Sequence, residues 1–509
     1  MPRPTGRGML YMKKYFLQPS WDLIPREYDI EFIPLQSGES FRAPISLANC
    51  ELLRRGASLR ELKTIPHFSE LLQRDIVAKE EMTNPSSPPK DYLELLQQTV
   101  IGPGRILHQI GECPTSNFED ISLNYSLGFG AKFIPHQSSL SEGWGADPDP
   151  LLAKIKAAVE GVERYALSSY DRQAFSHHSF DPATALTPEQ LGSSEQVLMS
   201  AGNLDWTTLQ EVNGPKTIEA PLDFLHHPVD YTELDRFPIA ALNISGIAGH
   251  QSLAAAQVNA LLELCEHEAL MVAWHSERTT PAITHDSIDP LCQNYISQVE
   301  AMGWQIIIKD ISLDLVPVVM VIGLGPTEKR ALTIGSCAAF SSKYAIKKAL
   351  TEVVRTILID EATTPAFPLI QPEEVQDIAG HGLYYARPEH LSEASHLWSG
   401  VDFIAASDQL THENRTLTEA ATAWAKSGSL EKGELNYLTE NVFKPAGIEI
   451  YFRDITPAGI TIPLFIVHTI APEMARLAVG YGRLPAQTKR LKGFLETSHR
   501  VVPSVHPFS

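Results

Sequence analysis

Cysteine is scarce in this 509-residue chain, and no two cysteines stand in a CxxC pair. The five are widely separated, at Cys50, Cys113, Cys265, Cys292 and Cys337. Neither a disulfide framework nor a zinc knuckle is therefore indicated. The chain lacks any apolar run of the roughly 18–20 residues that span a bilayer, and its basic first residues lack the apolar stretch of a secretory signal. We expect a cytoplasmic protein with no membrane partner.

Positive charge is scarce as well. The sequence has 41 Lys and Arg against 61 Asp and Glu, which gives a formal net charge of −20. Because nucleic-acid phosphates are bound chiefly by Lys and Arg, this balance argues against nucleic acid as a partner. There is also no GxxxxGK[ST] loop, dinucleotide-binding glycine fingerprint, GxSxG elbow or HExxH pair. Any ATP site in this chain must be built without a glycine-rich phosphate cradle.

The overall composition is that of an ordinary globular protein, with 43% hydrophobic and 20% charged residues. The segment 84–90, NPSSPPK, has the composition of a linker and predicts an N-terminal extension over residues 1–90 and a main domain over residues 91–509. Short strands at 28–35 and 40–45, followed by two amphipathic helical stretches, predict a small α+β extension compatible with a winged-helix module. No internal repeat is evident.

In the main domain, helical stretches alternate with apolar, strand-like stretches, which predicts an α/β fold of mixed sheets flanked by helices. We expect buried strands at 121–133, 237–247, 304–309, 316–323, 448–454 and 462–469. The Gly-, Asp- and Pro-rich segment 141–150 is predicted to be a loop. Residues 172–235 contain many Pro, His, Asp and Gly with little periodicity, so mostly irregular structure is expected there.

Three predicted helices carry charged groups beside an apolar stripe, at 154–165, 259–274 and 344–355. On the second, Asn259, Glu263 and Glu266 lie at i, i+4 and i+7, on one face. The charged sets of the other two are Glu160, Glu163 and Arg164, and Lys348, Glu352 and Arg355. Buried carboxylates are costly unless they are paired or bind a cation. The helices could converge on a polyanionic ligand with Mg²⁺, or be salt-bridged surface helices, and spacing alone leaves both open.

Several blocks in a characteristic order make the chain from roughly 91 to 509 resemble the YcaO superfamily. Within it, the chain is similar to the azoline-forming cyclodehydratases, the D components of thiazole/oxazole-modified peptide (RiPP and bacteriocin) biosynthesis. The blocks GWGADPDPLLAKIKAAVEGVERY, SGIAGHQSLAAAQVNALLELCEHEALMVAW and GSCAAFSSKYAIKKALTEVVR resemble the family's three ATP-binding helices with their preceding loops. YFRDIT and the terminal HPFS resemble the last strand and the proline-containing tail of these enzymes.

The resemblance implies ATP and Mg²⁺ as cofactors, bound between the three helices. It assigns ATP binding to nine residues: Lys156, Glu160, Glu163, Arg164, Asn259, Glu263, Glu266, Glu352 and Arg355. It assigns Mg²⁺ coordination to the five glutamates among them: Glu160, Glu163, Glu263, Glu266 and Glu352. In the tail, His506 and the carboxylate of Ser509 are implied as catalytic groups for proton transfer.

The implied reaction is the ATP-dependent cyclodehydration of Cys, Ser or Thr in a ribosomally made precursor peptide to thiazolines or oxazolines. The side chain adds to the preceding carbonyl, and phosphorylation of that amide oxygen turns it into a leaving group. The implied partners are the precursor peptide, an E1-like or leader-binding protein and a flavin dehydrogenase, in a homo-oligomer or a hetero-complex. Residues 1–90 are a candidate leader-binding module, in which a peptide would add a strand to a sheet edge.

Five positions depart from the family's pattern. Lys156 stands where Ser is usual, Trp144 where Lys is common, His267 where Arg is usual and Arg355 where Gln is common, and the tail ends in Ser509 instead of proline. Two alternatives to azoline formation therefore stay open. One is a YcaO protein that makes another backbone change, such as a thioamide. The other is a degenerate member that binds peptide or serves as a scaffold.

Overall fold

The computed structural model describes residues 89–115, 118, 120–131, 140–234, 236–276, 278–326, 330–363, 367–399, 430–458, 460–485, 487–496 and 505–508, and the backbone of short strands before residue 80 and at 403–404. Four of the five cysteines fall within these ranges, and all four are buried free thiols, as expected for a chain without a disulfide framework. None of the helices in this part of the chain is long and apolar enough to cross a membrane.

Before residue 80 the described strands form two antiparallel sheets, with the orders β5-β1-β6 and β2-β3-β4. The strands are β1 (Lys14–Leu17), β2 (Trp21–Pro25), β3 (Ile30–Pro34), β4 (Phe41–Ala43), β5 (Ala57–Ser58) and β6 (Val77–Lys79). β3 and β4 match the two predicted strands and pair with Ile30 opposite Ala43. The helices predicted in this extension lie outside the described residues, so the winged-helix interpretation and the 1–90 boundary stay predictions.

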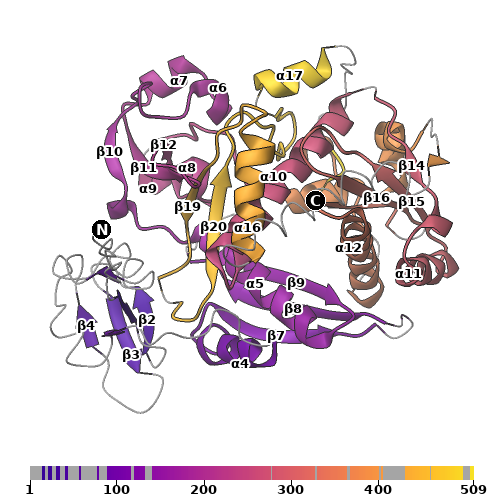
Figure 1. Ribbon diagram of the computed structural model, residues 1–509, viewed down its shortest axis with the longest axis horizontal. Helices are drawn as coiled ribbons and strands as arrows, with labels where there is room; N and C mark the ends of the chain where they lie inside the picture. The colour runs from indigo at the N-terminus through magenta and orange to yellow at the C-terminus, as the bar shows by residue number, and fades with distance from the viewer. Residues whose placement is uncertain are drawn as a thin grey trace, which may run out of the picture.

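The described part of the main domain contains three larger sheets (Figure 1). The first is antiparallel, with the order β7 (Leu107–Cys113), β8 (Ser122–Phe129) and β9 (Leu140–Asp147). The second has the order β10 (Ser176–Ser179), β11 (Asn203–Glu211), β19 (Tyr451–Asp454), β20 (Phe465–Ile470) and β13 (Ile247–His250), with β12 (Thr217–Pro221) also paired to β11. The third has the order β17 (Leu332–Ala338), β16 (Val318–Leu324), β15 (Gln305–Asp310), β14 (Ala282–Ile283) and β18 (Phe403–Ile404).

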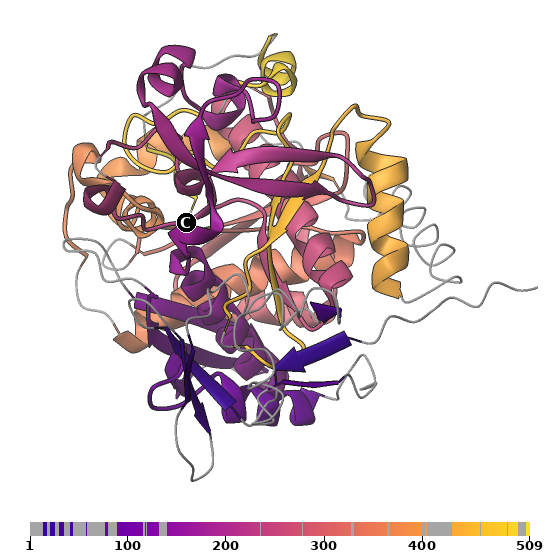
Figure 2. The same cartoon turned by 90° about the vertical axis from the view of Figure 1, so that its left-hand side faces the viewer.

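The second sheet joins distant parts of the chain. Figure 2 shows its magenta strands from the first half of the sequence beside the golden strands β19 and β20 from the last part, and β11 pairs antiparallel with β19. The third sheet is buried on both faces, because Met320 of β16 lies in one hydrophobic cluster and Val321 in another. Such double burial explains why the strand reads as the continuous apolar run that predicted it.

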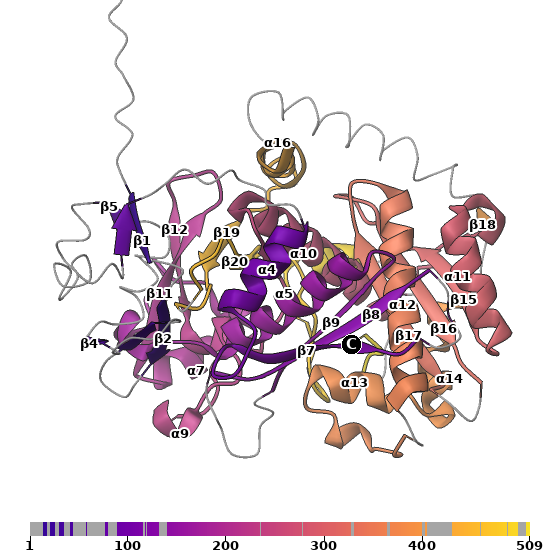
Figure 3. The same cartoon turned by 90° about the horizontal axis from the view of Figure 1, so that it is seen from below.

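Three long helices pack on these sheets, and each contains one of the predicted charged stretches. They are α5 (Pro150–Ser168), α10 (Leu253–His275) and α12 (Ser342–Thr363). α5 begins after Asp149, whose carboxylate accepts the Leu151 N–H at 2.9 Å, with Pro150 in its first turn. Seen from below, Figure 3 shows α5 lying along β8 and β9, and β9 also contacts α12.

The remaining helices lie around this centre. The longer ones are α4 (Pro89–Thr99), α11 (Pro290–Ala301), α16 (Leu430–Tyr437), which continues as a π-helix over Leu438–Phe443, and α17 (Lys489–Leu495). The short ones are α6 (Pro188–Leu191), α7 (Glu195–Ser200), α8 (Leu222–Leu225), α9 (Tyr231–Leu234), α13 (Ile378–Tyr384) and α14 (Leu391–Ala394). The predicted class, mixed sheets flanked by helices, is confirmed.

The prediction of a loop at 141–150 is wrong for most of that segment, because it forms β9. The glycines that suggested a loop serve close packing instead. A Cβ added to Gly143 would lie 2.2 Å from the Ala157 carbonyl oxygen of α5, and one added to Gly145 would lie 1.9 Å from that of Ala153. Only glycine lets the helix approach this strand so closely.

Two other predictions also fail. Residues 172–235 are not mostly irregular, since they form the strands β10 to β12 and the short helices α6 to α9; Asp205, which breaks the apolar pattern there, is buried and ion-paired. The strand predicted at 237–247 is absent except for its last residue. Phe237 is 87% exposed, whereas Asn243 is buried and accepts the Ser245 N–H in an irregular segment.

Candidate functional site

Three edge strands hold three of the predicted glutamates. Among the strands that the structure describes, β9, β13 and β17 each lie at the end of a sheet, so one side of each has backbone groups that no described strand occupies. Glu160 accepts the Trp144 N–H of β9 at 3.0 Å. Glu263 accepts the Ile247 N–H of β13 at 2.8 Å, and Glu352 accepts the Ser336 N–H of β17 at 3.2 Å.

These contacts reveal a repeat that sequence inspection missed. In each case the N–H donor precedes the glutamate by 16 residues. A glycine directly precedes each donor (Gly143, Gly246, Gly335) and an alanine stands three residues before each glutamate (Ala157, Ala260, Ala349). We call β9–α5, β13–α10 and β17–α12 the first, second and third strand–helix units. The same local geometry therefore places one carboxylate from each unit.

The residue three positions after each of these glutamates reaches the next unit. Glu163 of the first unit accepts the Gly249 N–H of β13 at 2.5 Å. Glu266 of the second accepts the Ala338 N–H of β17 at 3.2 Å and the Ser336 hydroxyl at 2.6 Å. Arg355 of the third donates to the Trp144 carbonyl of β9 at 3.5 Å. The three units thus form a closed cycle.

Burial and mutual repulsion make three of these carboxylates, those of Glu163, Glu263 and Glu352, resist ionisation. Desolvation first, and then the charges of Glu266 and Glu163, raise the pKa of Glu263 to about 8. Desolvation and the charge of Glu160 raise the pKa of Glu163 to about 7. Desolvation, together with Glu266, raises the pKa of Glu352 to about 7 although Lys348 opposes the shift. A bound cation would therefore stabilise the ionised form of these carboxylates.

The donor set fits Mg²⁺ bound together with phosphates. One oxygen each of Glu163 and Glu352 accepts a backbone N–H, while the other accepts no hydrogen bond from any described residue. Within the described ranges, no three His, Cys, Asp or Glu side chains are grouped so that they could hold a metal ion by themselves. Mg²⁺ commonly takes one or two carboxylates and completes its shell with water and substrate phosphates. The pairs formed by Glu163 with Glu263 and by Glu266 with Glu352 suit this mode of Mg²⁺ binding.

Cationic groups stand beside the glutamates. Arg164 and Arg355 lie 3.6 and 3.7 Å from the carboxylate of Glu160. Lys348, which the assignment by resemblance left out, acts on Glu352; although burial lowers its pKa, the acidic groups of Cys337, Glu352 and Glu266 raise it. Asn259 is exposed on α10, one turn before Glu263. The spacing of Lys348 and Glu352 on one helical face was the signal for Lys348.

Lys156 lies apart from this cycle. Its ammonium donates to the Asp147 carboxylate at 2.6 Å, and its side chain is 50% exposed. An exposed pair of this kind is worth at most about 1 kcal/mol. We therefore expect Lys156→Ser to change nucleotide affinity by no more than about 1–2 kcal/mol, the range for one charge-assisted hydrogen bond. Calorimetric titration with ATP and Mg²⁺ checks this, and complete loss of binding would identify Lys156 as a principal phosphate ligand.

The tail residues 505–508 are buried rather than free. The His506 ring donates from Nε2 to the Ala478 carbonyl at 2.5 Å, and its Nδ1 accepts the Phe508 N–H at 3.3 Å. Burial lowers the pKa of His506 well below its usual value, and the nearby rings of His381, His275 and His267 act in the same direction. Proton transfer by His506 stays a prediction, and it requires the ring to leave these contacts. Ser509 lies outside the described residues.

His267, which departs from the family's pattern, belongs to this neighbourhood. Its Nδ1 lies 2.8 Å from the Ser245 hydroxyl, and its Nε2 lies 3.9 Å from the Glu263 carboxylate. Because the Ser245 oxygen also accepts the Leu477 N–H, its own proton is available to Nδ1. Desolvation lowers the pKa of His267, so the ring contributes no fixed charge.

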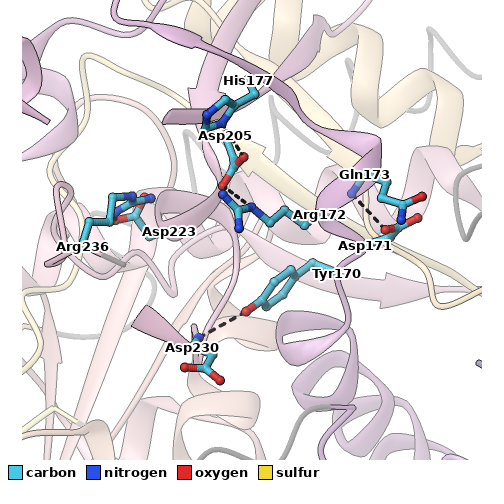
Figure 4. A network of polar contacts seen from close by, with 9 residues as sticks. All are labelled: Tyr170, Asp171, Arg172, Gln173, His177, Asp205, Asp223, Asp230 and Arg236. Atoms are coloured by element: carbon cyan, nitrogen blue, oxygen red, sulfur yellow. Dashed lines mark hydrogen bonds and ion pairs between the residues drawn. The ribbon is translucent and has the colours of Figure 1, made fainter. Parts of the chain in front are cut away.

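A second group of polar residues, around Asp205, is structural (Figure 4). The Asp205 carboxylate, 5% exposed, binds Arg172 at 2.9 Å and His177 at 3.1 Å. Arg236 forms two hydrogen bonds with the buried Asp223, at 3.0 and 3.1 Å. Asp205 and Asp223 therefore each have a cationic partner within this group.

The raised carboxyl pKa values predict a pH dependence of stability in the absence of divalent cations. A carboxyl group whose pKa is higher in the folded state stabilises the protein fully below its unfolded value of 4.5, and this contribution is lost as pH rises through about 7 to 8. Glu263→Gln resembles the protonated acid. We expect its melting temperature, relative to wild type, to rise between pH 5.5 and 8.5, as measured by calorimetry. A constant difference would contradict the raised pKa.

The chain is similar to known proteins both in its sequence family and in its fold. A family model described as "YcaO cyclodehydratase, ATP-ad Mg2+-binding" matches residues 144–475, more than half of the chain. No curated protein sequence matches the chain. The description of the family confirms ATP with Mg²⁺ as the predicted cofactors.

Solved structures share the fold at low identity. A "Heterocyclase in complex with substrate and Cofactor" is 15% identical with a TM-score of 0.63, covering 94% of this chain and 65% of that one, so this chain spans slightly less than two thirds of it. YcaO from Methanopyrus kandleri bound with AMPPCP and Mg²⁺ is 14% identical (TM-score 0.55; 76% and 92% covered). The E. coli microcin synthetase McbBCD complex with pro-MccB17 bound is 15% identical (0.50; 72% and 88%). The chain belongs to the YcaO family.

Proposed function

We propose that this protein catalyses the ATP-dependent cyclodehydration of Cys, Ser or Thr in a ribosomally made precursor peptide to thiazolines or oxazolines. The observation that carries the proposal is the closed cycle of three strand–helix units, which holds five glutamates beside Arg164 and Arg355. Family membership supports ATP and Mg²⁺, and a heterocyclase with substrate among the similar folds supports the reaction class.

The proposed roles follow from the contacts. Glu163 with Glu263, and Glu266 with Glu352, would hold Mg²⁺, because their backbone hydrogen bonds orient the carboxylates before any ligand binds. Arg164, Arg355 and Lys348 would offset the charge of the phosphates. When bound, ATP supplies the phosphoryl group that makes the amide oxygen a leaving group. Glu160, to which the resemblance also assigned Mg²⁺ coordination, would stand beside this centre with Asn259, and Lys156 would lie apart from it.

The proposed partners are the precursor peptide, an E1-like or leader-binding protein and a flavin dehydrogenase, in a hetero-complex or homo-oligomer in the cytoplasm. The microcin synthetase complex, whose structure contains a bound precursor, supports this kind of assembly. Residues 1–90 would bind the leader. A second candidate is a YcaO protein that forms a thioamide or binds peptide without turnover; the engaged ring nitrogens of His506 favour it, since they leave that histidine no free proton-transfer site in this conformation.

The test is to incubate the purified protein with ATP, Mg²⁺ and precursors encoded beside its gene, with and without the neighbouring E1-like protein. Loss of one water per azoline, coupled to ADP release, is the expected result. Exchange of oxygen for sulfur when sulfide is supplied would favour the thioamide instead. Binding of ATP and precursor with no change in precursor mass would contradict both reactions and favour a scaffold.

A further inference from the structure

The three strand–helix units meet at three junctions, and these are not alike. At the first junction Glu163 and Glu263 both accept backbone N–H groups of β13. Because these two carboxylates repel each other, they need a counter-charge. At the second, Glu266 and Glu352 both bond to Ser336 of β17. The first two junctions therefore each carry a pair of carboxylates.

The third junction has a guanidinium in place of the second carboxylate. Here Glu160 of the first unit accepts the Trp144 N–H of β9, but the residue that the third unit contributes is Arg355. A guanidinium has no acceptor, so it cannot take a strand N–H as Glu163 and Glu266 do. It donates instead to the Trp144 carbonyl, at 3.5 Å, and lies 3.7 Å from Glu160.

Charge separates the third junction from the other two. Glu160 is the acid of this junction and has two guanidiniums within 4 Å, those of Arg164 and Arg355. This acid is thus outnumbered by cations, whereas the two carboxylates of the second junction share the charge of Lys348 and the two of the first share that of Arg164. Arg355 is 28% exposed at its side chain, so its remaining N–H groups are within reach of a ligand. A planar guanidinium with several donors binds phosphate oxygens well.

We propose that Arg355 is the specificity-determining residue of the cycle. Its guanidinium makes the third junction accept phosphate oxygens, whereas the first two junctions accept Mg²⁺. The inference rests on the proposed function. A glutamate at position 355 would complete the repeat and place paired carboxylates at all three junctions, so Arg355 is the residue of the repeat that departs from this pattern. Arg355 would thereby fix the direction in which the nucleotide's phosphates lie across the three helices.

The test compares Arg355→Glu, which restores the residue type of the other two junctions, with Arg355→Lys. We expect Arg355→Glu to weaken the binding of ATP with Mg²⁺ more than about a hundredfold, because a charge-assisted contact is replaced by repulsion. Its affinity for Mn²⁺ alone should be equal to or higher than that of wild type. Arg355→Lys should keep nucleotide affinity within about tenfold. Arg483→Glu, on an exposed turn, makes the same change in net charge and should alter neither affinity.

Titration calorimetry gives the nucleotide affinities, and Mn²⁺ electron paramagnetic resonance gives the cation affinities without turnover. Nucleotide affinity unchanged in Arg355→Glu would overturn the proposal. So would an equal loss of Mn²⁺ and nucleotide, since that would make Arg355 a structural brace only. If wild type binds ATP with Mg²⁺ but forms no azoline while Arg355→Glu behaves as expected, the proposed function fails and the role of Arg355 stands.

Discussion

Glu263→Gln is expected to abolish precursor-dependent ATP consumption while the protein stays folded. The Gln side chain keeps the shape of Glu, and its carbonyl oxygen can still accept the Ile247 N–H. The variant loses the negative charge that a cation would need at the first junction. Glu163 would then be the only carboxylate of that pair. We expect the rate of ADP release to fall at least about a hundredfold. Replacing even a residue that only supports a metal ligand lowers metal affinity or activity about 10–100-fold.

The matched control is Glu361→Gln, an exposed position near the end of α12. It removes the same charge from one of the three site helices, yet lies more than two turns beyond Glu352. ADP release and far-ultraviolet circular dichroism should match wild type in this control. Unchanged ADP release in the Glu263 variant would remove Glu263 from metal binding, and loss of its helical signal would point to a folding defect instead.

Phe508→Ala is expected to lower the free energy of unfolding by about 3–5 kcal/mol, the usual range for a buried phenylalanine. Phe508 is 2% exposed, and its ring packs edge-on against Trp274 of α10, with 6.2 Å between ring centroids. The tail is also held by side chains of α13 and the residue that follows it, since His381 donates to the His506 carbonyl at 2.7 Å and Tyr385 donates to that of Val505 at 2.7 Å.

Chemical denaturation measures this effect, and the chain offers a matched control. Phe237→Ala removes the same side chain at a position that is 87% exposed, so its stability should stay within about 0.5 kcal/mol of wild type. A small effect of Phe508→Ala would mean that the tail is not docked in solution. If azoline formation at low temperature falls further than the folded fraction, the tail also takes part in chemistry, as predicted for His506.

The sequence could predict the three helices and their charged faces because helical spacing is local. Residues three and four apart share a face whatever surrounds them, so Glu160 with Glu163, and Glu263 with Glu266, were visible as pairs. The apolar run of β16 was equally direct, since both of its faces are buried. The acidic faces of the three helices were therefore accessible from spacing, whereas nucleotide binding followed only from the resemblance to the YcaO superfamily.

The sequence could not show what holds the carboxylates, because those partners are backbone groups. Any residue type supplies an N–H, and the three donors are Trp144, Ile247 and Ser336, which share nothing in their side chains. Glycine is also ambiguous: Gly143 is typical of a loop in the sequence, whereas in the structure it lets a helix pack closely on a strand. Burial of the tail depends on distant elements such as α13 and was out of reach for the same reason.

Because they bind to edge strands, the three glutamates are also expected to affect the solubility of the protein. An unpaired strand edge is a template on which another chain can add a strand, and proteins often block it with charge. Glu160, Glu263 and Glu352 occupy N–H groups on three such edges. We expect their replacement by alanine to increase self-association on mild heating, as followed by light scattering, more than replacement by glutamine, which still occupies the N–H group.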